Sequence, residues 1–265
     1  MSGASGRMGQ AIIHEATLRG HQISGAIEAP KCINLGKSMN ELGICGSQTK
    51  ILCSDNIQEA VADADVFISF TTPEADLINV PIVAKLHKRI VLGTTGFTPE
   101  QNIQVINAMN GKTPAVFSPN YSIGINILFK IAEQLEAFPA GYDFSINEIH
   151  HSGKGDAPSG TAKKLGEIVA QIRGYTKTVS CREGISLRHP EDLEITSSRA
   201  GGIVGVHDLI VAGPNEMLKI EHIAFTRDVF AQGAVIAAEW LSKRTEPKVY
   251  SMIDVLGLTQ PILHH

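Results

Sequence analysis

The sequence predicts an α/β protein of two domains, in which a parallel-sheet domain is followed by an α+β domain with a mixed sheet. In the first half, short apolar runs alternate with helical patterns of about a dozen residues, which is typical of a parallel sheet covered on both faces. After residue 120 the extended segments follow one another with Gly or Pro between them, which favours a mixed or antiparallel sheet. We expect the first domain to comprise residues 1–121 and 230–265, and the second to comprise residues 122–229.

Apolar periodicity places the elements of the first domain. Apolar residues recur at helical spacing after Gly9 until Gly20 ends the pattern, and further helices are expected at residues 56–64, 74–85 and 99–109. Short β-branched or apolar runs predict strands at residues 21–28, 66–70, 90–92 and 115–117. A polar loop at residues 29–48, rich in Gly, Asn and Ser, separates the first two strands.

The second domain begins with one long expected helix. It covers residues 123–138, and a second helix at 160–173 carries its apolar residues in a single stripe. Between and after these helices the extended segments are at residues 143–151, 193–199, 204–212 and 218–225. A final helix at 234–243 is expected to return to the first domain.

The composition excludes several classes of protein. The chain has 265 residues, of which 43% are apolar, and a net charge of −4, so it can bury a sizeable core. No run of Lys and Arg is longer than a pair, so nucleic acid is not an expected partner. The longest apolar stretches, such as residues 123–128, are far shorter than the roughly 20 residues that span a bilayer, so no membrane span is expected.

The cysteines predict the cellular compartment of the protein, and the two ends of the chain carry further features. The four cysteines lack CxxC spacing and no secretory leader precedes them, which predicts a reduced, cytoplasmic protein. Only Met1 and Ser2 precede Gly3, where a nucleotide-binding unit normally supplies a strand of about 5–6 residues, so the first strand is expected to be trimmed or absent. His264 and His265 are expected to have no function.

The segment from Gly3 to Gly9 is typical of a phosphate-binding turn that opens a helix, with Gly6 as its middle glycine. Glycine lets the backbone approach a pyrophosphate, and the free amides at a helix N-terminus favour an anion. The spacing is a variant of the common fingerprint, and a tight turn without a ligand remains the alternative. Glu28 lies 19 residues beyond Gly9, where an acid accepts hydrogen bonds from ribose hydroxyls. Together these features favour a Rossmann-type dinucleotide-binding domain.

The residues around Glu28 bear on the choice of cofactor. A carboxylate repels the 2′-phosphate of NADPH, and NADPH users usually place an Arg nearby to offset that repulsion. Here the next residue is Ala29, and the nearest alternative cations are Lys31 and Arg7. We therefore expect NADH to be preferred and NADPH to be tolerated.

Three loops follow strands of the first domain at the edge where ligands bind in open α/β sheets. They are residues 70–73, 93–97 and 118–121, and they combine Gly with small hydroxyl side chains. Such residues suit a ring or a carboxamide lying close to the backbone. Turns that merely end strands are the alternative interpretation.

A polar, Gly-rich segment at residues 148–161 carries the sharpest chemical signal. His150 and His151 point to opposite sides of an extended segment, and Lys154 follows in a Gly-flanked loop. The helix that starts at Gly160 and Thr161 offers amides and a hydroxyl to a carboxylate. Two imidazoles and an ammonium beside such a site can hold a dianionic substrate and supply a proton.

A metal site is the alternative interpretation of the paired histidines. Glu148 and Asp156 complete no recognisable ligand spacing, so no metal is expected. Arg227 either presents its guanidinium to the same cleft or pairs with Asp228 or a surface acid. The other histidines form no cluster in the sequence and are interpreted as structural or exposed: His14, His21, His87, His189, His207 and His222.

Four motifs resemble the dihydrodipicolinate reductase family, whose members are now called 4-hydroxy-tetrahydrodipicolinate reductases. They are GASGRMG at residues 3–9, GTTGF at 93–97, NYSIGIN at 120–126 and HHSGKGDAPSGTA at 150–162. The last motif is highly specific, whereas the Gly-rich turn is not. The similarity extends over essentially the whole chain.

The resemblance implies a role for each matching residue. His150 is implied to be the general acid/base and Lys154 the proton donor, while His151, Gly160 and Thr161 hold the substrate carboxylates. The implied cofactor contacts are Gly3, Ala4, Ser5, Gly6, Arg7, Met8, Glu28, Gly93, Thr94, Thr95, Ser118, Pro119, Asn120 and Tyr121. The chain departs from the family at Ala29, where many members carry Arg, so the cofactor is NADH or NADPH.

The resemblance also implies the reaction. It is the reduction of 4-hydroxy-tetrahydrodipicolinate, via dihydrodipicolinate, to tetrahydrodipicolinate in diaminopimelate and lysine biosynthesis. The enzyme is implied to be a homotetramer whose second domain binds the dicarboxylate substrate and forms the assembly. A semialdehyde or homoserine-type dehydrogenase is a competing hypothesis, but Cys181 lacks the setting of an activated nucleophile. A nucleotide-sensing module is another, although it would not need His150, His151 and Lys154.

Overall fold

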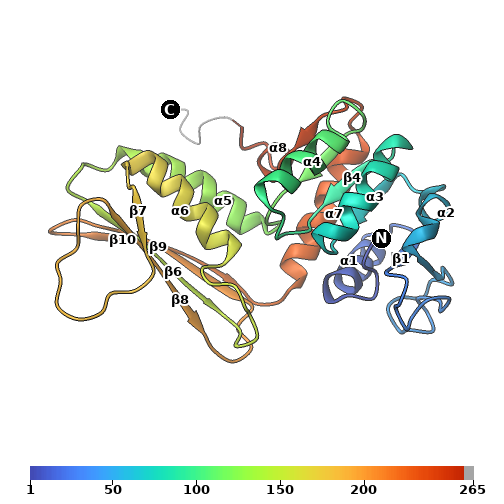
Figure 1. The fold of residues 1–265 in the computed structure, drawn as a ribbon, viewed down its shortest axis with the longest axis horizontal. Coiled ribbons are helices and arrows are strands. Elements are labelled where there is room, and N and C mark those ends of the chain that lie inside the picture. The colour runs from blue at the N-terminus through green and yellow to red at the C-terminus, as the bar shows by residue number, and fades with distance from the viewer. Residues whose placement is uncertain (260–265) are drawn as a thin grey trace. The chain divides into compact units, whose positions relative to one another are not determined.

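The computed structural model describes residues 1–259 and separates into two compact units (Figure 1). The first unit combines Met1–Ile123 with Arg227–Gly257, and the second comprises Gly124–Thr226. His264 and His265, for which we predicted no function, lie outside the described residues.

The first unit is a parallel α/β domain, as predicted. Its helices are α1 (Arg7–Leu18), η1 (Ser54–Asn56), α2 (Ile57–Val61), α3 (Pro73–Lys85), α4 (Pro99–Met109), α7 (Asp228–Ser242) and α8 (Met252–Val255). Its strands are β1 (Ala26–Glu28), β2 (Ile51–Cys53), β3 (Val66–Ser69), β4 (Arg89–Leu92), β5 (Ala115–Phe117) and β11 (Val249–Tyr250). Strands β11, β5, β4 and β3 form one parallel sheet in that order, and β1 pairs in parallel with β2. Ser2 bridges Ile27 of β1 and Ser69 of β3, so its backbone lies between the two sheets.

Both faces of this sheet are covered by helices, which explains its continuous apolar strands. Ile90 and Leu92 of β4 pack in one cluster with residues of α3 and α4, whereas Val91 packs in another with residues of α1 and α7. All three side chains are fully buried. Helices α3 and α4 begin where Thr72 and Thr98 cap them, each with a Pro at the start of the helix.

The second unit has the mixed sheet that we predicted. Its helices are α5 (Ile123–Gln134), η2 (Leu135–Ala137) and α6 (Gly160–Arg173). Its strands are β6 (Asp143–His150), β7 (Lys177–Val179), β8 (Asp192–Arg199), β9 (Gly205–Ala212) and β10 (Met217–Ala224). The order is β10-β9-β6-β8-β7, with antiparallel pairing of β9 to both β10 and β6 and parallel pairing elsewhere.

Strand β6 contributes side chains both to the apolar core of the second unit and to its polar cluster. Phe144, Ile146, Glu148 and His150 alternate along β6 and are all buried, so they share one face. Phe144 and Ile146 pack against apolar residues of α5 and α6, which cover this face (Figure 1). The same alternation that builds the apolar core therefore places a carboxylate and an imidazole at its end.

Several element boundaries differ from those predicted. Helix α7 starts at Asp228 instead of residue 234, because Gly233 weakens the helical pattern but packs tightly: a Cβ there would lie 1.7 Å from the Tyr121 carbonyl oxygen. The helix expected to reach residue 138 ends as α5 at Gln134 and continues as η2. Strands β2, β7 and β11 have two or three residues each, too few for alternation to show, and were not predicted.

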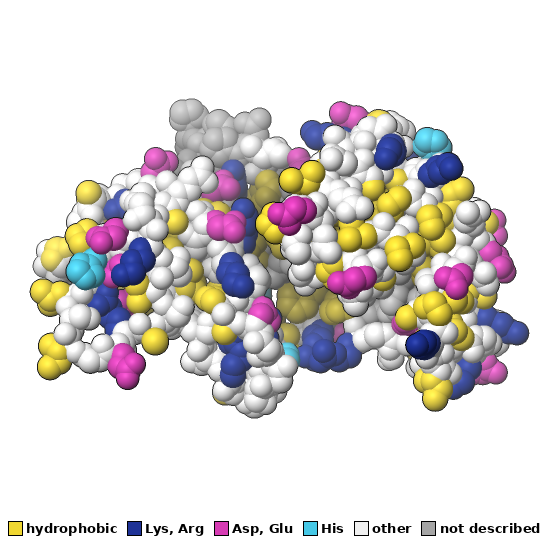
Figure 2. All heavy atoms as spheres, viewed as in Figure 1, with side chains coloured by type: hydrophobic (Ala, Val, Ile, Leu, Met, Phe, Trp, Pro, Cys, Tyr) yellow, Lys and Arg dark blue, Asp and Glu magenta, His cyan; other side chains and the backbone are white. Residues whose placement is uncertain are grey.

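The surface of the described residues mixes both signs of charge. Acidic and basic side chains are interspersed over the face shown in Figure 2. Among residues 1–259, every helix is too short or too polar to span a bilayer.

Candidate active site

The Gly-rich turn of the first unit requires glycine for steric reasons. Gly3 has a positive φ of 75°, and a Cβ there would lie 2.6 Å from the Phe70 carbonyl oxygen. A Cβ on Gly9 would lie 2.0 Å from the carbonyl oxygen of Gly3. Gly6 is exposed at the N-cap of α1, whose first amides have no acceptor within the helix. The turn therefore presents backbone amides at a helix N-terminus, which suits a phosphate.

The structure brings Glu28 to this turn. The Ser5 amide donates to Glu28 Oε1 at 2.7 Å, and the Ala29 amide donates to Oε2 at 3.3 Å. Ala29, Lys31 and Arg7 are all exposed. The acid predicted to bind a ribose thus lies at the end of β1 directly against the turn predicted to bind a pyrophosphate.

The loops after β3 and β4 are joined by a hydrogen bond. The Thr71 amide donates to Thr94 Oγ1 at 2.8 Å, and the Thr94 side chain is buried. A Cβ on Gly93 would lie 2.1 Å from the Phe70 ring, so a larger residue here would require that ring to move. Thr95 is exposed beside it. Both loops follow the carboxyl ends of neighbouring parallel strands, as predicted from the sequence.

The loop after β5 is anchored by the side chain of Tyr121. The Tyr121 hydroxyl is 2.9 Å from the Leu92 carbonyl oxygen, to which it donates, and burial raises the pKa of this phenol. Ser118 is buried and its hydroxyl donates to the Asn120 carbonyl oxygen at 2.8 Å. Pro119 is exposed. The Tyr121 ring and hydroxyl are therefore buried in the interior, and only the backbone of this residue is available to contact a ligand.

In the second unit a buried carboxylate gathers partners from three elements. The Glu148 side chain is fully buried, and its Oε2 lies 2.5 Å from Nδ1 of His150. Arg199, at the end of β8, donates to both carboxylate oxygens, at 2.8 and 2.9 Å. The backbone amide of Ser159, the N-cap residue of α6, donates to Oε1 at 3.0 Å. This bidentate, multiply bonded arrangement is the strongest kind of carboxylate contact in proteins.

The protonation states of this pair follow from burial and charge. Burial acts to raise the pKa of Glu148, but hydrogen bonds from Arg199 and His150 outweigh it and lower that pKa to about 2. Burial lowers the pKa of His150 by more than the contact with Glu148 raises it. At neutral pH, Glu148 is therefore ionised and His150 is neutral, so that Nδ1–H of His150 donates to the Glu148 carboxylate and the Nε2 lone pair is available.

Space beside Nε2 of His150 depends on a glycine. A Cβ on Gly205 would lie 3.1 Å from this nitrogen. Next to it, the His207 ring lies 5.1 Å from the His150 ring in an edge-on arrangement. His207 Nε2 is 3.2 Å from the Ser159 hydroxyl, which in turn accepts from the Ala162 amide to cap α6.

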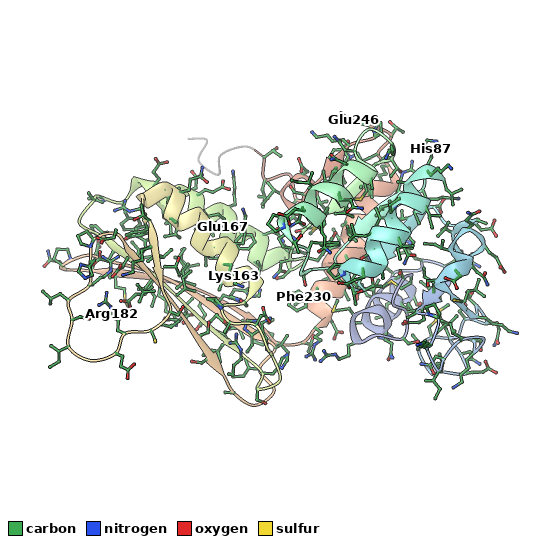
Figure 3. The ribbon with its side chains drawn as sticks, in the orientation of Figure 1. His87, Lys163, Glu167, Arg182, Phe230 and Glu246 are labelled. Atoms are coloured by element: carbon green, nitrogen blue, oxygen red, sulfur yellow. The ribbon has the colours of Figure 1, made fainter. Side chains whose placement is uncertain are left out.

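The remaining predicted residues lie in the loop between β6 and α6 and in the first turn of α6. The Lys154 ammonium pairs with Asp156 at 2.7 Å, and the Lys154 amide donates to the His151 carbonyl oxygen at 3.1 Å. Gly160 is exposed at the start of α6, and Thr161 follows it. Lys163, also exposed on α6 (Figure 3), adds a second ammonium to this segment. The structure thus brings together the histidines, the lysine and the helix start that were predicted to hold an anion.

Two residues of this cluster were missed in the sequence. Sheet register places Arg199 opposite His150 on β8 and His207 opposite Glu148 on β9. His207 had been interpreted with the isolated histidines. One signal was available, because His207 shares its alternation on β9 with the buried Leu209 and Val211.

Two predictions remain, one for Arg227 and one for metal binding. Arg227 is the N-cap residue of α7 and is partly buried, and its role stays a prediction. In the described part of the chain, no group of three or more His, Cys, Asp or Glu side chains is arranged to hold a metal ion.

Burial of His207 makes the stability of the second unit depend on pH. Burial, followed by the charge on His150, lowers the pKa of His207 to about 3, so only the unfolded chain takes up this proton as the pH falls from about 6.5 to about 3. We expect the free energy of unfolding to fall by about 2 kcal/mol between pH 7 and pH 5 because of His207 alone. Native-state hydrogen exchange at the β6 amides measures this free energy.

The matched variant is His207→Asn, which keeps a polar group facing Ser159 without a titrating one. It should remove this part of the pH dependence, whereas His14→Asn, at an exposed position on α1, should leave it unchanged. If the free energy of unfolding falls equally between pH 7 and pH 5 in His207→Asn and in the parent protein, the assignment to His207 is wrong.

Comparison with known proteins agrees with the geometry of both units. The family model for the N-terminal part of dihydrodipicolinate reductase matches residues 1–121, and the model for its C-terminal part matches residues 124–256. The 4-hydroxy-tetrahydrodipicolinate reductase of Geobacter sulfurreducens is 41% identical over 261 residues, which is 97% of either chain. The enzyme of the same name from Methanosarcina barkeri is 40% identical over 262 residues, again covering 97% of both chains.

Solved structures show the same fold. A dipicolinate-bound dihydrodipicolinate reductase from Paenisporosarcina sp. TG-14 matches with a TM-score of 0.73 at 23% identity, covering 96% of each chain. An amine dehydrogenase from Mycobacterium smegmatis matches with a TM-score of 0.64 at 13% identity, covering 92% of each. With both family models matched in order and relatives at 41% identity over nearly its whole length, the chain belongs to the dihydrodipicolinate reductase family.

Proposed function

We propose that this protein reduces 4-hydroxy-tetrahydrodipicolinate, by way of dihydrodipicolinate, to tetrahydrodipicolinate with NADH or NADPH, in diaminopimelate and lysine biosynthesis. The observation that carries this proposal is the cluster at the end of β6. A neutral His150, fixed by Glu148 and Arg199, lies beside the Lys154 loop and the N-terminus of α6. Membership of the reductase family supports the same reaction.

The residues of the first unit fit a pyridine nucleotide. The turn at Gly3 and Gly9 has no room for a Cβ, and the exposed amide end of α1 suits the pyrophosphate. We assign Glu28, which lies beside this turn, to the ribose hydroxyls, and the loops at 93–95 and 118–121 to the nicotinamide end. When bound, the nucleotide supplies a hydride. The exposed Ala29 after Glu28 supports a preference for NADH, because no side chain there offsets repulsion of a 2′-phosphate.

The residues of the second unit are suited to a dicarboxylate that must gain a proton. We assign the amides and hydroxyl at Gly160 and Thr161, with His151, to the carboxylates. Reduction of the conjugated ring leaves an enamine, which must be protonated. Since His150 is neutral at neutral pH, Lys154 is the proton donor, and Nε2 of His150 accepts or relays a proton.

The decisive assay follows oxidation of NADH, and then of NADPH, with substrate made in situ from pyruvate and aspartate semialdehyde by the condensing enzyme. We expect substrate-dependent oxidation with both nucleotides and a higher kcat/KM with NADH. Oxidation of NADPH at a much larger kcat/KM would contradict the cofactor preference. No turnover of a folded protein with either nucleotide would favour a nucleotide-sensing module over the reductase.

Substitution of the proton-transfer residues should act on kcat. We expect His150→Ala and Lys154→Ala each to lower kcat by about 10²–10⁴-fold, the range for loss of a general acid or base. Lys164→Ala, which removes an exposed ammonium of α6 that pairs with Glu167, is the control and should change kcat by less than about threefold. Retention of kcat in Lys154→Ala would remove Lys154 from the mechanism.

We also propose that the protein is a cytoplasmic homotetramer assembled through its second unit. Strand β10 is at an edge of the mixed sheet and exposes large apolar side chains at Met217, Leu218 and Ile223, with Phe225 just after it. The four cysteines are free, which fits a reducing compartment. Sedimentation equilibrium should give four times the chain mass of 28.4 kDa, and a stable monomer would contradict the assembly.

A further inference from the structure

A carboxyl group is buried beneath two loops of the first unit, and no step of the proposed reaction uses it. Asp76 lies in the first turn of α3, and its side chain is fully buried, whereas Glu74 in the same turn is exposed. Along α3 it shares the buried face with Asn79, Val80 and Val83. A fully buried carboxyl group is stable only where hydrogen bonds replace the water that it loses.

Three hydroxyl groups contact this carboxyl group. The Ser69 hydroxyl, at the end of β3, donates to Asp76 Oδ1 at 2.6 Å. The hydroxyls of Thr71 and Thr94 also form hydrogen bonds with the Asp76 side chain. Burial raises the pKa of Asp76, and all three hydroxyls act against that rise, as donors to a carboxylate do. Asp76 therefore joins the last residue of β3, the loop after β3 and the loop after β4.

The carboxyl group also fixes the direction of the hydrogen bond between the two loops. Thr94 Oγ1 accepts from the Thr71 amide at 2.8 Å, so the hydroxyl proton of Thr94 is free to donate to Asp76. Nearby, the Gly93 amide donates to the Ser69 carbonyl oxygen at 2.9 Å. A carboxylate suits this position because it only accepts hydrogen bonds and each of its oxygens has two lone pairs, so several hydroxyls can donate to it at once.

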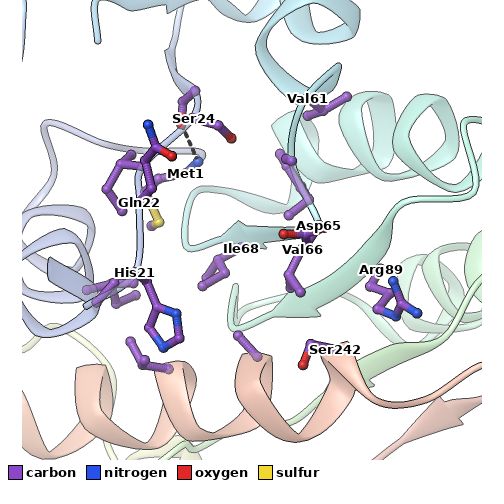
Figure 4. Close-up of a pocket in the computed structure, with 18 of the residues that line it drawn as sticks. Met1, His21, Gln22, Ser24, Val61, Asp65, Val66, Ile68, Arg89 and Ser242 are labelled. Atoms are coloured by element: carbon purple, nitrogen blue, oxygen red, sulfur yellow. Dashed lines mark hydrogen bonds between the residues drawn. The ribbon is translucent and has the colours of Figure 1, made fainter. Parts of the chain in front are cut away.

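The opposite end of β3 is less firmly packed. A cavity of about 610 Å³ lies beside the start of this strand, where Asp65, Val66 and Ile68 line it (Figure 4). The cavity removes packing contacts from this end, whereas Ser69 at the carboxyl end is fully buried. Contacts at the carboxyl end, including that of Asp76, therefore contribute more to holding the loop that follows β3.

We propose that Asp76 is a positioning residue for the nucleotide site, which through its hydroxyl partners holds the loops at residues 70–73 and 93–97 at the spacing that the nicotinamide end requires. This inference rests on the proposed function, which assigns the loop at 93–95 to that end. Asp76 has no exposed surface, so it acts through the loops and does not touch the nucleotide. The groups that it holds in place are the backbone of both loops and the exposed Thr95.

The first test is nucleotide binding in the absence of the dicarboxylate, measured by NADH fluorescence. Asp76→Asn keeps the volume of the side chain but places an amide that donates where a carboxylate oxygen accepts. We expect it to raise the Kd for NADH by about tenfold, since at least one hydroxyl loses its acceptor. KM for NADH should rise to a similar extent, whereas KM for the dicarboxylate should change by less than about twofold.

A double-mutant cycle identifies the partner through which Asp76 acts. Thr94→Val removes the hydroxyl, keeps the branched shape, and should by itself raise the Kd for NADH by about tenfold. If the two residues act through the same hydrogen bond, Asp76→Asn/Thr94→Val should bind NADH within about threefold of the weaker single variant. A combined loss of about a hundredfold would show independent effects and would overturn the proposal.

A matched control and a second measurement accompany these variants. Asp65→Asn removes an exposed carboxylate from the other end of β3 (Figure 4) and should change the Kd by less than about twofold. Without nucleotide, the Thr71 amide should exchange at least about tenfold faster in Asp76→Asn than in the parent. If Asp76→Asn does not fold, Ser69→Ala replaces it, because it removes one donor and leaves the carboxyl group, and it should raise the Kd by about threefold.

The outcomes separate this proposal from the proposed function. If the parent binds NADH and Asp76→Asn binds it equally well, or if the Thr71 amide exchanges equally fast in both, Asp76 has no positioning role and the reductase assignment is unaffected. A variant with a lower Tm and an unchanged Kd has the same meaning, because Asp76 then contributes only to stability. If the folded parent binds neither NADH nor NADPH, both proposals are wrong.

Discussion

The geometry of the second unit depends on one ion pair, between the fully buried carboxylate of Glu148 and the partly buried guanidinium of Arg199. Removing the guanidinium would leave a buried carboxylate without its counter-charge, which is destabilising. The carboxylate also holds His150 and the amide of Ser159, so a single group ties the ends of β6 and β8 to the start of α6. The position of the His150 imidazole, its tautomer and the position of the N-terminus of α6 are therefore set together.

This interaction explains what could be predicted from the sequence and what could not. His150, Lys154 and Gly160 lie within one short segment, so their shared chemistry is visible without knowledge of the fold. Arg199 and His207 reach the same site through strand pairing across about fifty residues, and pairing register is not encoded in any local pattern. Their roles became visible only when β8 and β9 were placed beside β6.

The same distinction applies to the fold. Helices α4 and α6 and strand β5 have the boundaries predicted, because caps or clear periodicity mark them. Helix α7 was predicted too short, since Gly233 weakens the helix locally while its close contact with the Tyr121 backbone stabilises the packing. Tertiary contact decides such positions, and a local pattern does not record it.

The two units differ in how firmly their ligand sites are held. The site around Glu148 is fixed by charged hydrogen bonds from several elements, whereas the Gly3 turn is held through the short ladder at Met1 and Ser2 and through the contact of Ser5 with Glu28. Ser2 lies between β1 and β3, which lack a longer strand between them in the described residues. Because the turn follows directly from Ser2, its position relative to the carboxyl edge depends on that ladder. The position of the backbone amides in the turn therefore depends on these few backbone bonds.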